Sequence, residues 1–532
     1  MGGNGRALAE PVARHMTPAT LEPGANEEES GDLLALIFRH AMERPTALAL
    51  LDDNVSLSYS ELLDASGRVA AGLSGIGISA GDRVALHLGN SAMFVTVALG
   101  CLWLGASFVP ISPEDPATRV SRILEDCEPL AVVVRDGAVP PLGMGPNCGA
   151  VRAASLITTA GAPPARASDH ARDAYLVYTS GTTGAPKGVC VQEHALTWSV
   201  SSAVQYLGYG QMTRSLAASA FHFDGSFSTL FGTLVGGGTL VVPPREELLF
   251  IRPFFRNVLE HNINATSFSP SYLRMLVSSR DLKQLAGSDL STVAIGGEEC
   301  VASDVARLWE VLPQARIFNR YGPTESTIAV TSYQILAEDV AAGVIPLGEP
   351  HAGVSFYLLS PNGLVDQPGE LGALYIGGKQ LMRGYWGDRQ LSEQVLRADL
   401  VPGHVVYETG DLAYRDDMGR YIWAGRVDDV VKRRGVRIGL SEVARVFAAV
   451  EGVRAAICLA VENAGRLEIV AYVEADTDVT QAELVAAGGA QLPAAMLPDD
   501  VVVVGSLPVN SVGKVDRGRL LAASGRVAWR NR

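Results

Sequence analysis

The chain has 532 residues, 48% of them hydrophobic, and a formal net charge of −14. A chain of this length can bury at least one large core, and two or three packed units are expected. The negative charge argues against sequence-independent binding to nucleic acid or to an anionic membrane, because both attract basic surfaces. The expected partners are therefore small molecules and other proteins.

The predicted elements begin near Gly31, because residues 33–45 repeat apolar side chains at helical spacing and stop at a proline. Residues 1–30 contain no apolar segment like that of a secretory signal, and we expect a disordered leader there. No later segment is an uninterrupted apolar run of membrane-spanning length. These features favour a cytoplasmic protein.

Short β-rich runs then alternate with helix-like stretches, a pattern typical of α/β layers with largely parallel sheets. The β-rich runs are residues 83–88, 107–111, 130–134, 175–180 and 238–244, and helix-like stretches are residues 121–128 and 252–262.

A second pattern follows a charged connector around Asp428: a helix over residues 441–450 and strands over 455–461 and 468–475. The predicted fold class is α/β, with a large N-terminal core of layered β-sheets and flanking helices over residues 31–427. A small mobile α+β C-terminal domain over residues 428–522 and a tail over 523–532 complete the prediction.

The six cysteines are scattered, with no CxxC pair and no histidine beside them at the spacing of a metal site. Reduced thiols are the simple interpretation.

The strongest local motif is YLVYTSGTTGAPKGV, from Tyr175 to Val189, where an apolar strand enters a loop rich in glycine and hydroxyl residues. Glycines let the backbone turn around phosphate oxygens, while hydroxyls, amides and a lysine supply donors. The spacing does not fit a Walker loop. A mobile surface turn is the alternative to a phosphate-binding loop. The residues of this loop are Thr179, Ser180, Gly181, Thr182, Thr183, Gly184 and Lys187.

With this loop, the sequence resembles the adenylate-forming superfamily, and within it the amino-acid adenylation domains of nonribosomal peptide synthesis. The resemblance covers nearly the whole chain after the leader, because further family motifs follow in order. They are LSYSEL at Leu57, LGASFVPISPEDP at Leu104, FDGS at Phe223, NRYGPTE at Asn319, GELGALYIGG at Gly369, YETGDL at Tyr407, GRVDDVVKRRGVRIGLSEV at Gly425 and LPVNSVGKVDR at Leu507.

The resemblance implies ATP and Mg²⁺ as cofactors. It implies that Tyr321 lies against adenine and that Asp411 accepts hydrogen bonds from both ribose hydroxyls. Glu325 resembles the magnesium-binding carboxylate, which neutralises adjacent phosphates. The further nucleotide-binding residues that it implies are Gly297, Glu298, Asn319, Gly322, Thr324 and Arg426.

Lys514, in VGKVDR, resembles the catalytic lysine that holds the substrate carboxylate against the α-phosphate. A solvated surface lysine is the alternative. Asp428 resembles the hinge between the two domains, and Arg437 a residue that meets the α-phosphate or the thiol side. The family rotates its small domain between adenylation and thioester formation.

Asp224, in FDGS, resembles the aspartate that pairs with a substrate ammonium, which favours an amino acid over a fatty or aryl acid. Arg320 favours a planar anion, so we expect a dicarboxylic amino acid, either aspartate- or glutamate-like or a β-amino relative. An Arg320 that points outward to a salt bridge is the alternative. The other residues implied to line the pocket are Gly225, Ser228, Ser267, Ala294, Gly296, Ile328 and Ala329.

The acyl acceptor is expected to be the phosphopantetheine thiol of a separate carrier protein, with coenzyme A as the second choice. The nearest rival function is an acyl-CoA synthetase that activates a carboxylic acid without an amine. A non-catalytic scaffold of the same fold is a more distant alternative, which the retention of Lys187, Glu325, Asp411 and Lys514 disfavours.

Overall fold

The computed structural model describes residues 32–158, 162–167, 169, 171–180, 186–248, 250–433, 436–463, 466–476, 479–492, 496–509 and 515–528. The predicted leader lies outside these residues. Within them, no helix combines the length and the apolar character that crossing a membrane requires.

The largest sheet has eight strands, and the six central ones are parallel to one another. The antiparallel edge strands are β14 and β2. In spatial order the strands are β14 (Thr331–Gln334), β13 (Arg316–Tyr321), β12 (Thr292–Gly296), β11 (Ala265–Phe268), β9 (Arg214–Leu216), β10 (Thr239–Val241), β1 (Leu48–Leu51) and β2 (Ser56–Ser58).

The second sheet has seven strands and mixes parallel with antiparallel pairs. In spatial order they are β18 (Gly384–Tyr385), β8 (Pro186–Gln192), β7 (Asp173–Ser180), β4 (Ser107–Pro110), β3 (Arg83–His87), β5 (Ala131–Val134) and β6 (Gly149–Arg152).

A third, antiparallel sheet has six strands, and β21 pairs with β20 beside its main path. The strands are β16 (Gly363–Leu364), β15 (Val354–Ser360), β17 (Gly372–Gly378), β20 (His404–Arg415), β19 (Leu396–Val401) and β21 (Tyr421–Arg426).

Local sequence explains where the helices begin and end. Helix α2 starts at a capping box in which Ser58 and Glu61 bond to each other's backbone. Helix α6 ends at Gly208, whose φ of 73° is the left-handed conformation that glycine adopts freely. The N-terminal helices are α1 (Leu33–Glu43), α2 (Tyr59–Gly75), α3 (Ala92–Leu104), α4 (Ala117–Cys127), α5 (Ala153–Ile157), α6 (Glu193–Leu207), α7 (Phe227–Val235) and α8 (Arg245–Leu248).

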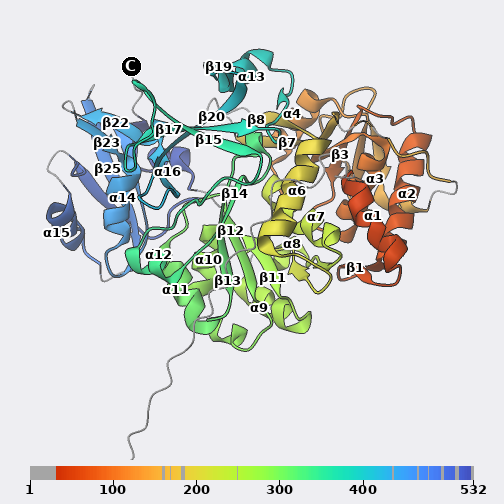
Figure 1. The fold of residues 1–532 in the computed structure, drawn as a ribbon, viewed down its shortest axis with the longest axis horizontal. Helices are drawn as coiled ribbons and strands as arrows, with labels where there is room; N and C mark the ends of the chain where they lie inside the picture. Colours follow the sequence, from red (N-terminus) through yellow and green to blue (C-terminus); the bar gives the residue numbers. More distant parts are fainter. Residues whose placement is uncertain are drawn as a thin grey trace, which may run out of the picture. The chain divides into compact units, whose positions relative to one another are not determined.

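Two hydrophobic clusters place α6 and α7 between the first two sheets (Figure 1). Phe227 of α7 packs its ring against Phe108 and Tyr175 of the seven-stranded sheet. Ala203 of α6 packs against the eight-stranded sheet. A third cluster covers the other face of that sheet with α9 (Ile251–Glu260), α10 (Pro270–Val277) and α11 (Ala302–Val311).

The C-terminal part has its own sheet and its own hydrophobic clusters. Helix α14 (Leu440–Ala448), helix α15 (Gln481–Gln491) and helix α16 (Arg517–Ala523) accompany strands β26 (Asp500–Val504), β25 (Arg466–Ala475), β24 (Val453–Asn463) and β27 (Val527–Ala528). A short hairpin of β22 (Val430–Arg433) and β23 (Val436–Gly439) precedes them. The remaining helices are α12 (Ala337–Ala342) and α13 (Arg389–Val395).

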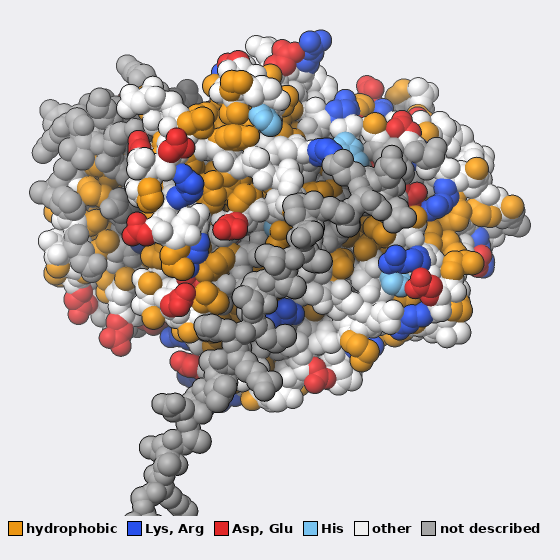
Figure 2. Space-filling model, viewed as in Figure 1, with side chains coloured by type: hydrophobic (Ala, Val, Ile, Leu, Met, Phe, Trp, Pro, Cys, Tyr) orange, Lys and Arg blue, Asp and Glu red, His pale blue; other side chains and the backbone are white. Residues whose placement is uncertain are grey.

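The predicted α/β class is confirmed, and the predicted helices and strands fall on helices and strands of the structure. The expectation of largely parallel sheets holds for the eight- and seven-stranded sheets and is wrong for the six-stranded sheet, whose strand pairs are antiparallel. The domain boundary near residue 427 stays a proposal, which the separate C-terminal sheet and clusters support. On the face shown in Figure 2, exposed hydrophobic side chains are interspersed with charged ones of both signs.

Candidate functional site

The predicted substrate residues gather at the carboxyl ends of three neighbouring parallel strands, where ligands of α/β sheets bind. The register pairs Ser267 of β11 with Ala294 of β12, and Gly296 of β12 with Arg320 of β13. Because alternate residues of a strand point to the same face, these four residues share one face of the sheet. This face meets α7, where Ser228 lies 2.5 Å from Arg320 Nη1.

Asp224 begins the short helical turn that leads into α7, and it is buried. Its carboxylate accepts hydrogen bonds from Thr324 Oγ1 at 3.1 Å and from the amide of Ile328 at 3.3 Å. Burial, assisted by the neighbouring charge of Glu325, raises its pKa to about 6, whereas the Thr324 bond opposes the shift. Asp224 forms no ion pair within the described part of the chain, so a cation would stabilise its ionised form.

The backbone that supplies the Ile328 amide is strained. Thr327 and Ile328 have φ values of 60° and 70°, and β-branched residues rarely adopt this left-handed conformation. Strain of this kind persists only where the surrounding structure enforces it, and it gathers at functional sites. Thr327 is held by a hydrogen bond to the carbonyl of Gln380, so this wall of the pocket is rigidly positioned.

Arg320 is buried, with 6% of its surface exposed, and its guanidinium points to Ser228 of α7 rather than to solvent. Its guanidinium donates to Ser228 at 2.5 Å and to Ser332 at 3.3 Å, while Nη2 has no hydrogen-bond partner among the described residues. Burial lowers its pKa to about 10, so the group remains charged at neutral pH. No described acidic residue forms an ion pair with it, and the outward-pointing alternative does not hold.

Sequence reasoning missed three residues beside Arg320. Tyr209 and Thr229 are buried, and apart from each other neither hydroxyl has a hydrogen-bond partner among the residues that the structure describes. His351 is buried against the stacked ring of Tyr206, and both of its ring nitrogens are unpartnered there. No motif marks these positions, because they come close to Arg320 only through the packing of loops and helices on the sheet.

Tyr321 and Asp411, the predicted adenine and ribose residues, are hydrogen-bonded to each other at 2.6 Å. Asp411 also accepts from Arg426 Nη1 at 3.1 Å and from Trp423 Nε1 at 3.3 Å. Burial and the charge of Asp411 raise the pKa of the Tyr321 phenol, which stays a donor. A carboxylate has about four acceptor positions, so these three bonds orient Asp411 and leave it able to accept another. Trp423 was not predicted.

The other predicted nucleotide residues surround the same strand ends. Asn319 donates to the carbonyl of Pro346 at 2.7 Å, and Glu298 accepts from the amide of Ser271 at 3.1 Å. Gly297 has a φ of 90°, which glycine adopts without strain. A Cβ on Gly322 would lie 2.5 Å from the Cα of Ala329, so this glycine lets the motif pack against the pocket wall.

Glu325, the predicted metal ligand, accepts a 2.7 Å hydrogen bond from the phenol of Tyr385. Lys187 of the predicted phosphate loop lies over the same ring, with Nζ 5.4 Å from its centroid. Among the described residues, no three or more acidic, histidine or cysteine side chains form a metal cluster. A single carboxylate beside the phosphate loop fits Mg²⁺, which is usually bound by one or two carboxylates and substrate phosphates.

Several predicted residues lie outside the described part of the chain. They are Gly181, Thr182, Thr183, Gly184 and Lys514, together with the side chains of Ser180, Asp428 and Arg437. The strands on either side of the loop are described, and they pair Thr179 with Lys187. The two ends of the predicted phosphate loop are therefore held side by side by paired antiparallel strands.

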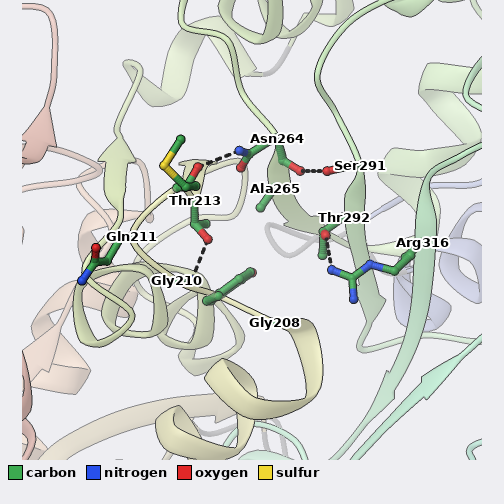
Figure 3. Close-up of a pocket in the computed structure, with 11 residues that line it drawn as sticks. Gly208, Gly210, Gln211, Thr213, Asn264, Ala265, Ser291, Thr292 and Arg316 are labelled. Carbon is green, nitrogen blue, oxygen red and sulfur yellow. Dashed lines mark hydrogen bonds between the residues drawn. The ribbon is translucent and has the colours of Figure 1, made fainter. Parts of the chain in front are cut away.

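A separate pocket of about 310 Å³ lies at the opposite, amino ends of the strands (Figure 3). Its polar groups bond to one another: Asn264 to the carbonyl of Met212, Gly210 to Thr213, and Arg316 to Thr292. Arg316 also donates to the carbonyl of Leu207, at the end of α6. These hydrogen bonds hold the end of α6 and the starts of the strands together. The pocket shares none of the predicted site residues, but Tyr209 is among the residues that line it.

Comparison with known proteins gives a consistent result. A family model described as AMP-binding enzyme matches residues 37–386. Surfactin synthase subunit 2 of Bacillus subtilis is 31% identical over 517 residues, which cover 95% of this chain and 14% of that protein. The chain thus spans about a seventh of the length of this curated relative.

Solved structures share the fold. The four-domain nonribosomal peptide synthetase AB3403, bound to AMP and glycine, is 30% identical with a TM-score of 0.79. The match covers 92% of this chain and 36% of that one. A benzoate CoA ligase from Burkholderia xenovorans is 22% identical with a TM-score of 0.81, over 92% of this chain and 99% of that one. The second likeness concerns the fold alone.

Proposed function

Because the chain belongs to the family of AMP-binding enzymes, we propose that it adenylates a dicarboxylic amino acid and passes the acyl group to a carrier protein. The substrate is aspartate- or glutamate-like, or a β-amino relative, and the acceptor is the phosphopantetheine thiol of a separate carrier. ATP and Mg²⁺ are the cofactors of adenylate-forming enzymes.

One observation carries the choice of substrate. Asp224 and Arg320 are buried groups of opposite charge near the start of α7, and neither forms an ion pair with a described residue. Hydrogen bonds connect them in space: Ser228 bonds both to Arg320 and to the carbonyl of Gly225, which follows Asp224. A substrate with an ammonium for one and a carboxylate for the other would compensate both charges.

The reaction has two steps. A substrate carboxylate oxygen attacks the α-phosphorus of ATP, the bond to the β-phosphate oxygen breaks, and pyrophosphate leaves. The thiol sulfur then attacks the acyl carbon, the bond to AMP breaks, and the thiol proton passes to solvent. We propose that Glu325 holds Mg²⁺, which neutralises phosphate charge when bound, and that Lys514 positions the substrate carboxylate.

The nucleotide contacts follow from the same arrangement. Tyr321, fixed by its bond to Asp411, would present its ring to adenine, and the acceptor position left on Asp411 would bind a ribose hydroxyl. Lys187, at the base of the phosphate loop, would approach the phosphates from the side of Glu325. Arg437 and the hinge at Asp428 belong to the proposed mobile domain, which would turn between the two steps.

An acyl-CoA synthetase that activates an acid without an amine is the second candidate, because a benzoate CoA ligase has the same fold. Asp224 disfavours it, since a buried carboxylate would face an uncharged substrate. The amino-acid proposal gains support from AB3403, whose structure contains glycine.

The test is substrate-dependent pyrophosphate exchange with ATP and Mg²⁺, over neutral, basic, aromatic, dicarboxylic and β-amino acids and their deaminated analogues. Exchange confined to dicarboxylic amino acids is expected. Exchange only with deaminated acids would overturn the amino-acid proposal and favour the second candidate. Thioester formation with a phosphopantetheinylated carrier or with coenzyme A then separates the two acceptors.

A further inference from the structure

Beside the proposed substrate pocket, three polar atoms have no hydrogen-bond partner outside their own group. They are the Tyr209 hydroxyl, Thr229 Oγ1 and Arg320 Nη2. The two hydroxyls are close enough to interact with each other, and no other described residue hydrogen-bonds to any of the three atoms. The three side chains are 6%, 3% and 6% exposed, so bulk solvent does not reach them freely. Buried donors without partners are rare in native proteins, and such groups often mark a place for a ligand or an ordered water.

One face of α7 brings these atoms together. Ser228 bonds to Arg320 at 2.5 Å, and Thr229 is the next residue of the helix. One turn further, a Cβ added to Gly232 would lie 3.1 Å from the Tyr209 ring. Because residues three and four apart share a helix face, α7 places Tyr209 alongside Thr229 and near Arg320.

The sheet places Tyr209 on the same side. Tyr209 packs on Ala294 and Phe318, which pair with each other across β12 and β13. Gly296 and Arg320 are the next residues of these strands on that face. Tyr209 therefore packs on the pair of residues that comes just before Gly296 and Arg320 on this face, toward the amino ends of the strands.

The electrostatics agree with this placement. Burial raises the pKa of the Tyr209 phenol, while the nearby charge of Arg320 and a hydrogen bond from the Thr229 hydroxyl both lower it. His351, the neighbouring imidazole, has its pKa lowered to about 3 by burial and by Arg320. It is therefore neutral in the physiological range, and Arg320 is the cation of this group. One guanidinium and two hydroxyls form a donor set that matches one carboxylate.

We propose that Tyr209 and Thr229 form the floor of the substrate pocket with Arg320, and that their hydroxyls bind the second carboxylate of the amino acid. This inference rests on the proposed function and extends it to two residues outside the sequence motifs. The hydroxyls donate to a carboxylate oxygen, and Arg320 Nη2 supplies the charged bond. The pocket then rejects the corresponding amide, because an NH₂ group cannot accept these donors.

The test uses Tyr209→Phe and Thr229→Val, which remove the hydroxyls and keep the size of each side chain. Substrate-dependent pyrophosphate exchange is measured with aspartate, glutamate, their amides asparagine and glutamine, and β-amino dicarboxylic acids. For the preferred dicarboxylic acid, each variant should lower kcat/KM about tenfold, mainly through KM. The preference over the matching amide or nearest neutral analogue should fall by the same factor.

Tyr59→Phe is the matched control. Tyr59 is also buried, but its one hydroxyl hydrogen is shared between the carbonyls of Leu234 and Gly238, away from the proposed pocket. This variant should lower the melting temperature without changing the ratio of dicarboxylic to neutral substrates.

The outcomes separate the inference from the proposed function. If the wild-type protein activates no dicarboxylic amino acid, the proposed substrate class fails, and with it the inference. If the wild-type protein prefers a dicarboxylic acid and both variants keep that preference, the inference alone is wrong. An equal loss for every substrate would assign the two hydroxyls a structural role and would also overturn it.

Discussion

The phenol of Tyr385 donates a 2.7 Å hydrogen bond to Glu325 Oε1, and the same ring lies under the ammonium of Lys187 at 5.4 Å. One side chain thus contacts both the proposed metal-binding carboxylate and the lysine of the proposed phosphate loop. This hydrogen bond already orients the Glu325 carboxylate, so Mg²⁺ binding would not have to restrict the side chain further.

Tyr385→Phe should therefore raise the Mg²⁺ concentration for half-maximal pyrophosphate exchange about fivefold to tenfold, because it releases Glu325 and keeps the ring below Lys187. The KM for the amino acid should change little. A magnesium titration at saturating ATP measures the effect. Tyr357→Phe, in β15, is the control, and superimposable magnesium curves for all three proteins would refute the orienting role of Tyr385.

Arg320→Met should reduce the preference for a dicarboxylic over a neutral amino acid by about 100-fold or more, because the substrate carboxylate loses its buried partner. Turnover of a small neutral amino acid should change only a few fold. Replacing a buried unpaired charge by an apolar side chain should leave thermal stability unchanged or raised. Exchange assays and a melting curve test both statements, and uniform loss across the substrate panel would contradict them.

Asp224 predicts a pH dependence of substrate binding. Its pKa of about 6 means that the carboxyl becomes neutral below that pH and no longer attracts the substrate ammonium. The KM for the amino acid should rise about tenfold per unit as pH falls below 6. Initial rates between pH 5 and 8 measure this. A KM that stays constant through pH 6 would exclude Asp224 as the ammonium partner.

Asp224 also predicts the sign of a stability effect. Its folded pKa is raised above the unfolded value near 4, so the folded state binds the proton more tightly and loses stability as pH rises from about 4 through 6. The loss is on the order of 3 kcal/mol. The substitution Asp224→Asn removes it, so without substrate the variant should be more stable than the wild-type protein, and the difference should be larger at pH 7.5 than at pH 5. Thermal melts at the two pH values measure this, and a variant less stable than wild type at pH 7.5 would show that the carboxylate is compensated.

Two glycines of the site should respond differently to the same change. A Cβ on Gly322 would meet the Cα of Ala329 at 2.5 Å, whereas a Cβ on Gly225 would meet nothing within 4 Å. Gly322→Ala should therefore displace the pocket wall and lower kcat/KM by about two orders of magnitude or prevent folding. Gly225→Ala should fold with wild-type stability. Circular dichroism and exchange assays compare them, and equal tolerance of both substitutions would contradict the packing of Gly322.

The sequence allowed the class of fold and most helices and strands to be predicted, because periodicity and turn residues act locally. The helix predicted over residues 33–45 is observed as Leu33–Glu43, and the predicted strand over 83–88 as Arg83–His87. Motif residues such as Asp224 and Arg320 could also be named, through the resemblance to the adenylation domains. The side-chain position of Arg320 could not, because a sequence pattern does not distinguish a buried guanidinium from an exposed one.

The residues that the sequence did not reveal share one property: they contribute through distant contacts. Trp423 reaches Asp411 across paired strands, and Tyr385 reaches Glu325 from another sheet. Tyr209 comes beside Arg320 only because α7 packs on the sheet. Such neighbours follow from the assembled topology, and no local periodicity encodes them.

The left-handed backbone at Thr327 and Ile328 has a consequence for changing the enzyme's selectivity in the laboratory. The amide of Ile328 donates to Asp224 from this conformation, so the same two residues would shape the proposed pocket and orient the proposed ammonium partner. Glycine or asparagine would relax the strain, yet would also let the amide move away from Asp224. Libraries that vary the substrate range are therefore best directed at Ser228, Ser267 and Ala294, with Thr327 and Ile328 held constant.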